Sequence, residues 1–219
     1  NTRLGPLPIL ENCNFCIMNF FDSAAFQILL VIAAYFLGSI NSAILVSRAR
    51  CLPDPRTLGS GNPGATNMLR AGSKFDAAVT LFGDLLKGFI PVFITRVFIG
   101  DEHLVAVVGL AALLGHIYPI YYRFKGGKGV ATTLGILLGL DWLLGVLWLL
   151  VWVGVAYLSR YSSLAALVAT VLTPVFAWLL QFSSWEIGLL TMLVLFIYWR
   201  HRSNIGNLLS GNEPKLSRN

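Results

Sequence analysis

Seven long apolar stretches limit what this chain can fold into more than any other feature of its sequence. They span Phe26–Val46, Ala77–Phe98, Leu104–Tyr118, Val130–Leu140, Trp142–Leu158, Leu164–Gln181 and Ile187–Trp199. A soluble domain carries about 25% charged residues, whereas this chain has 12% charged and 56% hydrophobic residues. Because helices satisfy their own backbone hydrogen bonds in lipid, the sequence predicts an all-α, polytopic integral membrane protein.

The number of spans depends on the fourth stretch, Val130–Leu140, which is short for about 30 Å of hydrocarbon. Only Asp141 separates it from the fifth, so one helix through Asp141 would give six spans and two helices give seven. Loop charge favours seven. Of the 16 basic residues, thirteen fall in alternate connections or the tail: Arg48, Arg50, Arg56, Arg70, Lys74, Arg123, Lys125, Lys128, Arg160, Arg200, Arg202, Lys215 and Arg218. The positive-inside rule then predicts seven transmembrane helices, with the N-terminus outside and the C-terminus cytoplasmic.

Residues 1–19 precede the first apolar stretch and have no place in this scheme. Their prolines and short apolar content do not fit a secretory signal. We expect them to be an N-terminal extension, either vector-derived or extracytoplasmic, and residues 20–219 to form a single seven-helix domain. Cys13 and Cys16 form a lone CxxC, which is half of a four-ligand site, so we expect no redox role and no metal there.

The first of three polar, glycine-rich stretches on the predicted cytoplasmic side is Leu58–Arg70. It contains G-x-G-x-x-G, but it follows a membrane helix rather than a strand, which argues against dinucleotide binding. Its glycines, short polar side chains and arginine suit an anion. A plain loop with turn glycines and Arg70 as a membrane anchor is the equal alternative. The candidate site residues are Ser60, Gly61, Asn62, Gly64, Thr66, Asn67 and Arg70.

The second stretch, Gly115–Thr133, is not a P-loop, because Val130 stands where Ser or Thr is required. A glycine loop that opens into a helix near Val130 would aim free N–H groups and the positive end of the helix dipole at one point. Two lysines add charge there, which favours a phosphate site over a pure topology signal. The candidates are His116, Lys125, Gly126, Gly127, Lys128, Gly129 and Thr132.

The third stretch, His201–Glu213, follows the last apolar stretch and adds His201 and Asn204, while Ser163 lies in the loop after the fifth. Within the membrane, Asp84 and Lys87 are three residues apart and share a helix face. We expect them to form an internal ion pair that ties their helix to a neighbour. His103 is expected to be exposed to solvent.

Together these stretches resemble the bacterial acylphosphate-dependent glycerol-3-phosphate acyltransferases, the PlsY family. The resemblance extends from Phe26 to Lys215. It rests on Ser60-Gly61-Asn62-x-Gly64-Ala65-Thr66-Asn67-x-x-Arg70, on Gly115-His116-x-x-Pro119 with Phe124-Lys125-Gly126-Gly127-Lys128-Gly129-Val130-Ala131-Thr132, and on His201-Arg202-x-Asn204-Ile205 with Gly211-x-Glu213. It implies a multi-pass enzyme of the bacterial inner membrane with its active site facing the cytoplasm.

The implied reaction transfers a fatty acyl group from acyl phosphate to the 1-hydroxyl of sn-glycerol 3-phosphate. It gives lysophosphatidic acid and phosphate, as the first step of phospholipid biosynthesis. The implied partners are these two substrates and the lipid bilayer, with no nucleic acid and no cofactor, and docking of the acyl-phosphate-forming enzyme is left open. The residues that match the family's functional positions are Ser60, Arg70, Lys128, Ser163, His201 and Asn204.

The proton acceptor is left open among His116, His201 and the substrate phosphate, whose second pKa is about 6. No histidine is followed five positions later by aspartate, which argues against the H-x-x-x-x-D mechanism of acyl-CoA-dependent glycerolipid acyltransferases. A transporter would spread polar groups through the bundle, but here only Asp84 and Lys87 lie deep. Phosphatidyl transfer from a CDP-activated lipid would need a paired-aspartate motif, and the chain has no Asp-Gly dipeptide to begin one.

Overall fold

The computed structural model describes residues 23–70 and 73–216, and within these ranges every regular element is a helix. The predicted all-α class is confirmed, while residues 1–19 with Cys13 and Cys16 lie outside the described residues. The helices are α2 (Ala24–Gly38), α3 (Ser42–Ala49), α4 (Ala65–Arg70), α5 (Lys74–Phe98), α6 (Glu102–Ile117), α7 (Val130–Leu140), α8 (Trp142–Ser159), α9 (Ser162–Val171), α10 (Thr173–Leu179), α11 (Ser184–Arg200) and α12 (Arg202–Leu209), with single 3-10 turns η1 (Pro55–Thr57) and η2 (Ile120–Tyr122).

Four helical segments are long and apolar enough to cross a membrane, and the bent pair α2 and α3 would make a fifth. The four are α5, α6 with the turn after it, α8, and α9 together with α10. Helix α7 is apolar but has only 11 residues. The described chain therefore has the helices of a polytopic membrane protein.

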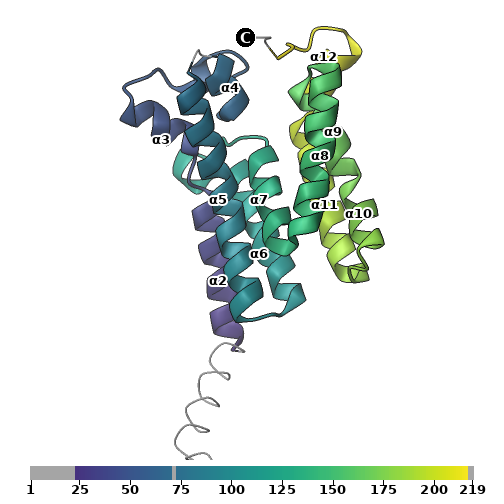
Figure 1. The fold of residues 1–219 in the computed structure, drawn as a ribbon. Coiled ribbons are helices and arrows are strands. Elements are labelled where there is room, and N and C mark those ends of the chain that lie inside the picture. The colour runs from purple at the N-terminus through teal and green to yellow at the C-terminus, as the bar shows by residue number, and fades with distance from the viewer. Residues whose placement is uncertain (1–22, 71–72, 217–219) are drawn as a thin grey trace, which may run out of the picture.

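The helices form two groups (Figure 1). One contains α2, α5, α6 and α7, with α2 packed along α6 and α5 along α7. The other contains α8 to α11, with α8 packed along α9. Contacts of α7 with α8 and of α6 with α11 join the groups. Helices α3, α4 and α12 lie at the same end of the molecule (Figure 1).

Glycines set the spacing of the closest helix pairs. A Cβ atom on Gly38 of α2 would lie 2.1 Å from the backbone oxygen of Ala112 in α6. A Cβ on Gly88 of α5 would lie 2.3 Å from the backbone oxygen of Thr132 in α7. Glycine allows the backbones of two helices to come this close. In a bilayer, where the lipid tails are as apolar as the side chains, close van der Waals packing is a main cause of helix association.

Helix α7 begins part-way along α5 rather than at its end. The Thr132 hydroxyl donates to the backbone oxygen of Asp84 at 3.0 Å. Asp84 is ten residues after the first residue of α5, Lys74, which corresponds to roughly 15 Å at the α-helical rise. The bounds of α7 are those predicted, Val130–Leu140. The alternative of one helix through Asp141 is wrong, because Asp141 has extended backbone and caps α8 by accepting from the Leu143 and Leu144 N–H groups.

Two other expected helices are not continuous. The stretch Phe26–Val46 breaks after Gly38, and α2 and α3 meet at a 47° bend. The break is stabilised by polar groups, since Ser39 Oγ donates to Tyr35 O at 2.8 Å and Asn41 caps α3. The stretch Leu164–Gln181 is divided into α9 and α10, and a proline lies in the first turn of α10, where its missing N–H costs no hydrogen bond.

The predicted ion pair in α5 is confirmed. Lys87 Nζ lies 2.9 Å from Asp84 Oδ1, and both side chains are buried. The lysine also donates to Ile40 O at 2.6 Å, and the Ser42 N–H donates to Asp84 Oδ1 at 3.4 Å. The pair thus satisfies backbone groups freed by the break between α2 and α3. His103 is exposed, as expected, and its ring meets the edge of the Trp185 ring.

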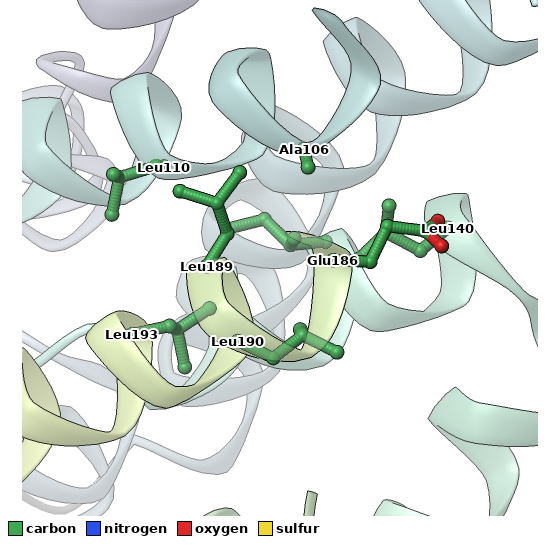
Figure 2. A pocket seen from close by; sticks show the side chains of 8 residues that line it. Ala106, Leu110, Leu140, Glu186, Leu189, Leu190 and Leu193 are labelled. Carbon is green, nitrogen blue, oxygen red and sulfur yellow. The ribbon is translucent and has the colours of Figure 1, made fainter. Parts of the chain in front are cut away.

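A small apolar cavity lies where α6, α7 and α11 meet, and Figure 2 shows leucines from these helices around it. Its volume of about 10 Å³ is close to that of one water molecule. The Glu186 carboxylate beside it accepts from the N–H and hydroxyl of Ser183, so it serves the start of α11. This cavity is a packing defect rather than a ligand site.

Candidate active site

A cavity of about 450 Å³ is lined by residues of both helix groups, together with residues of α4 and Asn204 of α12. Residues of α4 and α5 line one side, residues of α8, α9 and the segment after α11 line the other, and the first turn of α7 also reaches it. All six residues predicted to be catalytic line this cavity: Ser60, Arg70, Lys128, Ser163, His201 and Asn204. Three distant motifs therefore meet in one place.

The residues predicted to bind substrate divide into two sets. Asn62, Gly64, Thr66, Asn67, His116 and Gly129 line the cavity. Gly61, Lys125, Gly126, Gly127 and Thr132 are not among the residues that line it. Of this second set, Lys125 is exposed, whereas Gly126, Gly127 and Thr132 are buried behind the cavity wall.

A chain of hydrogen bonds joins the second and third motifs. Lys128 Nζ donates to Asn204 Oδ1. The Asn204 amide in turn donates to Glu213 Oε1 at 2.7 Å, and Ser163 Oγ donates to the same oxygen at 2.6 Å. Glu213 was not among the predicted site residues, although it belongs to the Gly211-x-Glu213 pattern of the third motif. Because the Glu213 carboxylate accepts from the amide nitrogen of Asn204, the amide oxygen is the atom that points to Lys128.

The ammonium of Lys128 is in an unusual environment. Burial lowers the pKa of Lys128 to about 8; Glu213 opposes the shift, while the positive charges of Arg70 and Arg200 add to it. The group is therefore charged at neutral pH and loses its charge just above it. Because folding has already removed much of the water around this ammonium, binding an anionic ligand costs little further desolvation.

The first turn of α7 provides a second feature that suits an anion. Gly129 has φ of +85°, and a Cβ there would lie 2.5 Å from Leu113 Cδ1, so both conformation and space require glycine. No side chain in the described part of the chain caps this helix. Val130 and Ala131 line the cavity beside Lys128. A helix N-terminus next to an ammonium is suited to binding phosphate.

Two imidazoles line the cavity, and the hydrogen bonds of each indicate where its proton lies. His201 Nδ1 is 2.8 Å from Ile197 O, and because a carbonyl only accepts, Nδ1 carries the hydrogen. Burial lowers the pKa of His201 to about 4, so its Nε2 keeps a lone pair at neutral pH. His116 Nδ1 is 3.2 Å from Thr132 Oγ1, whose own hydrogen goes to Asp84 O, so Nδ1 donates here too.

The first motif is shaped by one side chain. Asn67 is buried, its Nδ2 donates to Pro55 O at 2.7 Å and to Leu58 O at 3.0 Å, and its Oδ1 accepts from the Ser60 N–H at 3.0 Å. Asn67 thereby holds Ser60 at the cavity. Arg70, at the end of α4, donates to Pro214 O in the C-terminal segment at 3.0 Å.

The second motif is held through its backbone. Arg200 donates to Gly126 O from Nη2 at 2.9 Å and to Gly127 O from Nε at 3.1 Å. The Gly127 N–H donates to His116 O at 3.2 Å. In the sequence, Arg200 indicates only the topology, because nothing in its position distinguishes it from the nearby Arg202.

Metal chemistry has no obvious site in this part of the molecule. Within residues 23–70 and 73–216, no group of three or more His, Cys, Asp or Glu side chains is arranged to hold a metal ion. The polar groups that line the cavity are cations, amide and hydroxyl donors, two imidazoles, and the carboxylates of Asp84 and Glu213.

Comparison with known proteins gives one consistent family. A family model described as glycerol-3-phosphate acyltransferase matches residues 28–211. The chain is 52% identical over 187 residues to the glycerol-3-phosphate acyltransferase of Thioalkalivibrio sulfidiphilus, covering 85% of this chain and 92% of that one. It is 56% identical over 183 residues to that of Methylobacillus flagellatus, covering 84% and 93%.

Two crystal structures of PlsY (YgiH), an integral membrane glycerol 3-phosphate acyltransferase, are also similar, each with 38% sequence identity. The glycerol 3-phosphate form has a TM-score of 0.84 and covers 87% of this chain and 96% of that one. The lysophosphatidic acid form has a TM-score of 0.82, with 87% and 95% covered. The family model, the relatives and the fold agree, and this chain, an integral membrane enzyme, belongs to the PlsY family of glycerol-3-phosphate acyltransferases.

Proposed function

We propose that this enzyme transfers a fatty acyl group from acyl phosphate to the 1-hydroxyl of glycerol 3-phosphate, releasing lysophosphatidic acid and inorganic phosphate. The observation that carries the proposal is that one cavity combines cationic and amide donors with an apolar wall. Its apolar residues include Ala77, Ala78, Leu81, Leu134, Trp148 and Leu149. Two phosphorylated substrates, one of them with a fatty chain, need both kinds of surface.

Lys128 and the α7 N-terminus are assigned to the acyl phosphate. The two features lie together, and both stabilise the negative charge that develops on the leaving phosphate. Arg70 and Asn204 are assigned to glycerol 3-phosphate, with Ser60 and Ser163 donating to phosphate or carbonyl oxygens. Of the remaining predicted residues, Gly126, Gly127 and Thr132 are assigned to supporting this binding surface from behind.

The reaction needs no covalent acyl-enzyme, because acyl phosphate is already an activated mixed anhydride. The 1-hydroxyl oxygen attacks the carbonyl carbon, the bond from that carbon to the phosphate oxygen breaks, and phosphate leaves with the electron pair. We propose that the hydroxyl proton passes to Nε2 of His201, which lines the cavity and carries no hydrogen because Nδ1 donates to Ile197 O. The substrate phosphate, whose second pKa is about 6, is the alternative acceptor. His116 is less suitable, because the backbone of Gly127 lies against its Nε2.

The topology proposed for the enzyme has seven crossings, with the N-terminus outside and the cavity open to the cytoplasm. The alternating loop charge supports it, as does the match of each predicted apolar stretch to a helix or a helix pair. Single cysteines at Glu102 and Lys125, in a background with the native cysteines replaced by serine, should react with an impermeant maleimide from opposite sides of the membrane. Labelling of both from one side would contradict this topology.

The reaction is tested with purified enzyme in detergent. We expect phosphate release from palmitoyl phosphate only when glycerol 3-phosphate is present, and formation of lysophosphatidic acid in equal amount. Palmitoyl-CoA serves as the alternative donor. Preferred use of the thioester, or no turnover of the acyl phosphate, would overturn the assignment of the donor.

A further inference from the structure

The glycine loop that carries Lys128 is attached to the end of α11 by a planar cation. Nη2 and Nε of Arg200 donate to two consecutive carbonyls, those of Gly126 and Gly127, at 2.9 and 3.1 Å. A guanidinium presents its donors in a rigid fork, so bonds to both carbonyls fix the orientation of two successive peptide planes. A lysine at this position could not do this, because its ammonium is a point charge on a flexible stem.

This attachment lies beside a second one. Lys128, which directly follows the two glycines, donates to Asn204, which lies four residues after Arg200. On the opposite side, the Gly127 N–H donates to His116 O at 3.2 Å. The loop is therefore held between the ends of α6 and α11. Arg200 itself is half-buried and is not among the residues that line the cavity.

We propose that Arg200 is a positioning residue for acyl transfer. It orients the Gly126 and Gly127 peptides so that Lys128 and the first turn of α7 face the donor phosphate. This role rests on the function proposed above, in which Lys128 binds the acyl phosphate. It differs from that of a catalytic residue, since Arg200 acts through the loop.

The neighbouring Arg202 is a natural comparison. It is exposed, its guanidinium lies 4.9 Å from the centre of the Trp199 ring, and it donates to Trp199 O within its own segment. A cation needed only to anchor the cytoplasmic end of a helix would resemble Arg202, and lysine would serve as well. The forked contact with another loop distinguishes Arg200.

The test compares R200K and R200Q with wild type and with the control R202Q, using palmitoyl phosphate and glycerol 3-phosphate between pH 6 and 9.5. We expect both Arg200 variants to lose about tenfold or more in kcat/KM for palmitoyl phosphate, as for one charge-assisted hydrogen bond. R202Q should match wild type. Wild-type kinetics in R200K would overturn the proposal, because charge alone would then suffice.

The pH profile separates positioning from general instability. The charges that act on Lys128 are those of Arg200, Arg70 and Glu213, and the neutral His201 imidazole is its titratable neighbour. Removal of the Arg200 charge in R200Q should raise the pKa of Lys128 and move the alkaline loss of activity to higher pH, whereas R200K should keep it in place. A loss of activity with the alkaline limb unmoved in both variants would indicate damaged protein and would contradict the proposal.

Hydrogen exchange gives a readout that does not depend on turnover. In R200K the amides of residues 126–129 should exchange faster, while those in the middle of α5 and α8 exchange as in wild type. Unchanged exchange in the loop would refute the role of Arg200. If wild type itself fails to use palmitoyl phosphate, the proposed donor fails, but faster exchange in R200K would still show that Arg200 holds the loop.

Discussion

The two glycine-rich loops at the cavity are similar in composition but are held in different ways. The first, before α4, is organised by the Asn67 side chain, which bonds three backbone groups of its own loop. The second, before α7, is held through its carbonyls and N–H groups by Arg200 and His116, from the ends of two other helices. One loop is locally determined and the other depends on tertiary structure.

The difference affects what each loop offers to a ligand. The first presents short side chains and Arg70 from a six-residue helix near the surface. The second presents the N-terminus of α7, part-way along α5, together with a half-buried ammonium. Charge in the second loop is less screened by water, and its interactions with a phosphate are correspondingly stronger. We expect the second loop to dominate catalysis.

The largest expected effect is therefore that of Lys128→Ala. Loss of a preorganised donor to developing charge lowers kcat by about 10² to 10³, and the effect should fall mainly on kcat because the charge on the leaving phosphate grows in the transition state. Steady-state kinetics with palmitoyl phosphate measures it. The control is Arg123→Gln, an exposed cation five residues earlier, which should stay within about twofold of wild type. If kcat falls less than tenfold in Lys128→Ala, the second loop does not dominate catalysis.

A glycine-to-alanine pair tests the conformational difference between the loops. Gly129→Ala should lower stability by about 2–4 kcal/mol, since it combines positive φ with a close contact to Cδ1 of Leu113, a fully buried side chain with little room to move. Gly61→Ala also has positive φ, but its Cβ would lie 3.4 Å from Arg56 O, so about 1 kcal/mol is expected. Thermal unfolding followed by tryptophan fluorescence in detergent gives the two values. Equal losses would mean that space at Gly129 does not matter.

The sequence could predict an all-helical membrane protein because bilayer helices are specified by long apolar stretches, whereas the seven crossings and their orientation stay predictions. It could not predict the break after Gly38, since Ser39 and Asn41 lie in an apolar context and the backbone groups freed there are satisfied by Asp84 and Lys87 of another helix. The hydrophobic pattern of one apolar stretch does not show which side chain of another helix bonds its free backbone groups. The ion pair itself was predictable from its spacing.

The site shows the same division between local and distant information. The predicted residues that line the cavity came partly from motif chemistry, because glycine, lysine and asparagine suit phosphate, and partly from the family resemblance. Arg200 was not, since its role arises from contact with carbonyls that lie more than seventy residues earlier in the chain. Gly126 and Gly127 were predicted to bind substrate, but the structure places them behind the cavity wall.

A smaller effect is expected for Asn67→Ala, which tests the side-chain-organised loop. It leaves Pro55 O, Leu58 O and the Ser60 N–H without their partner, at a cost of about 2 kcal/mol. Ser60 should then be less well held, and KM for glycerol 3-phosphate should rise about tenfold with a smaller change in kcat.

The matched control for Asn67→Ala is Asn212→Ala, in which an exposed amide loses a single local bond to Ser210. This variant should leave both stability and KM unchanged within error. If Asn67→Ala raises KM no more than this control, the first loop keeps its shape without its asparagine, and the contrast between the two loops disappears.

The smallest effect expected is a change of pH dependence that belongs to the second loop alone. Burial lowers the pKa of Lys128 to about 8, so the ammonium needed for phosphate binding is lost as the pH rises through that value. Activity should fall about fourfold between pH 7 and 8.5, the change in the charged fraction of one such group. In Lys128→Arg the guanidinium stays charged, so the activity of this variant, normalised at pH 7, should not fall over this range. The cation of the first loop is already an arginine, which does not titrate in this range. If activity still falls at alkaline pH in Lys128→Arg, another group must titrate, and Lys128 is not the cause of the pH dependence.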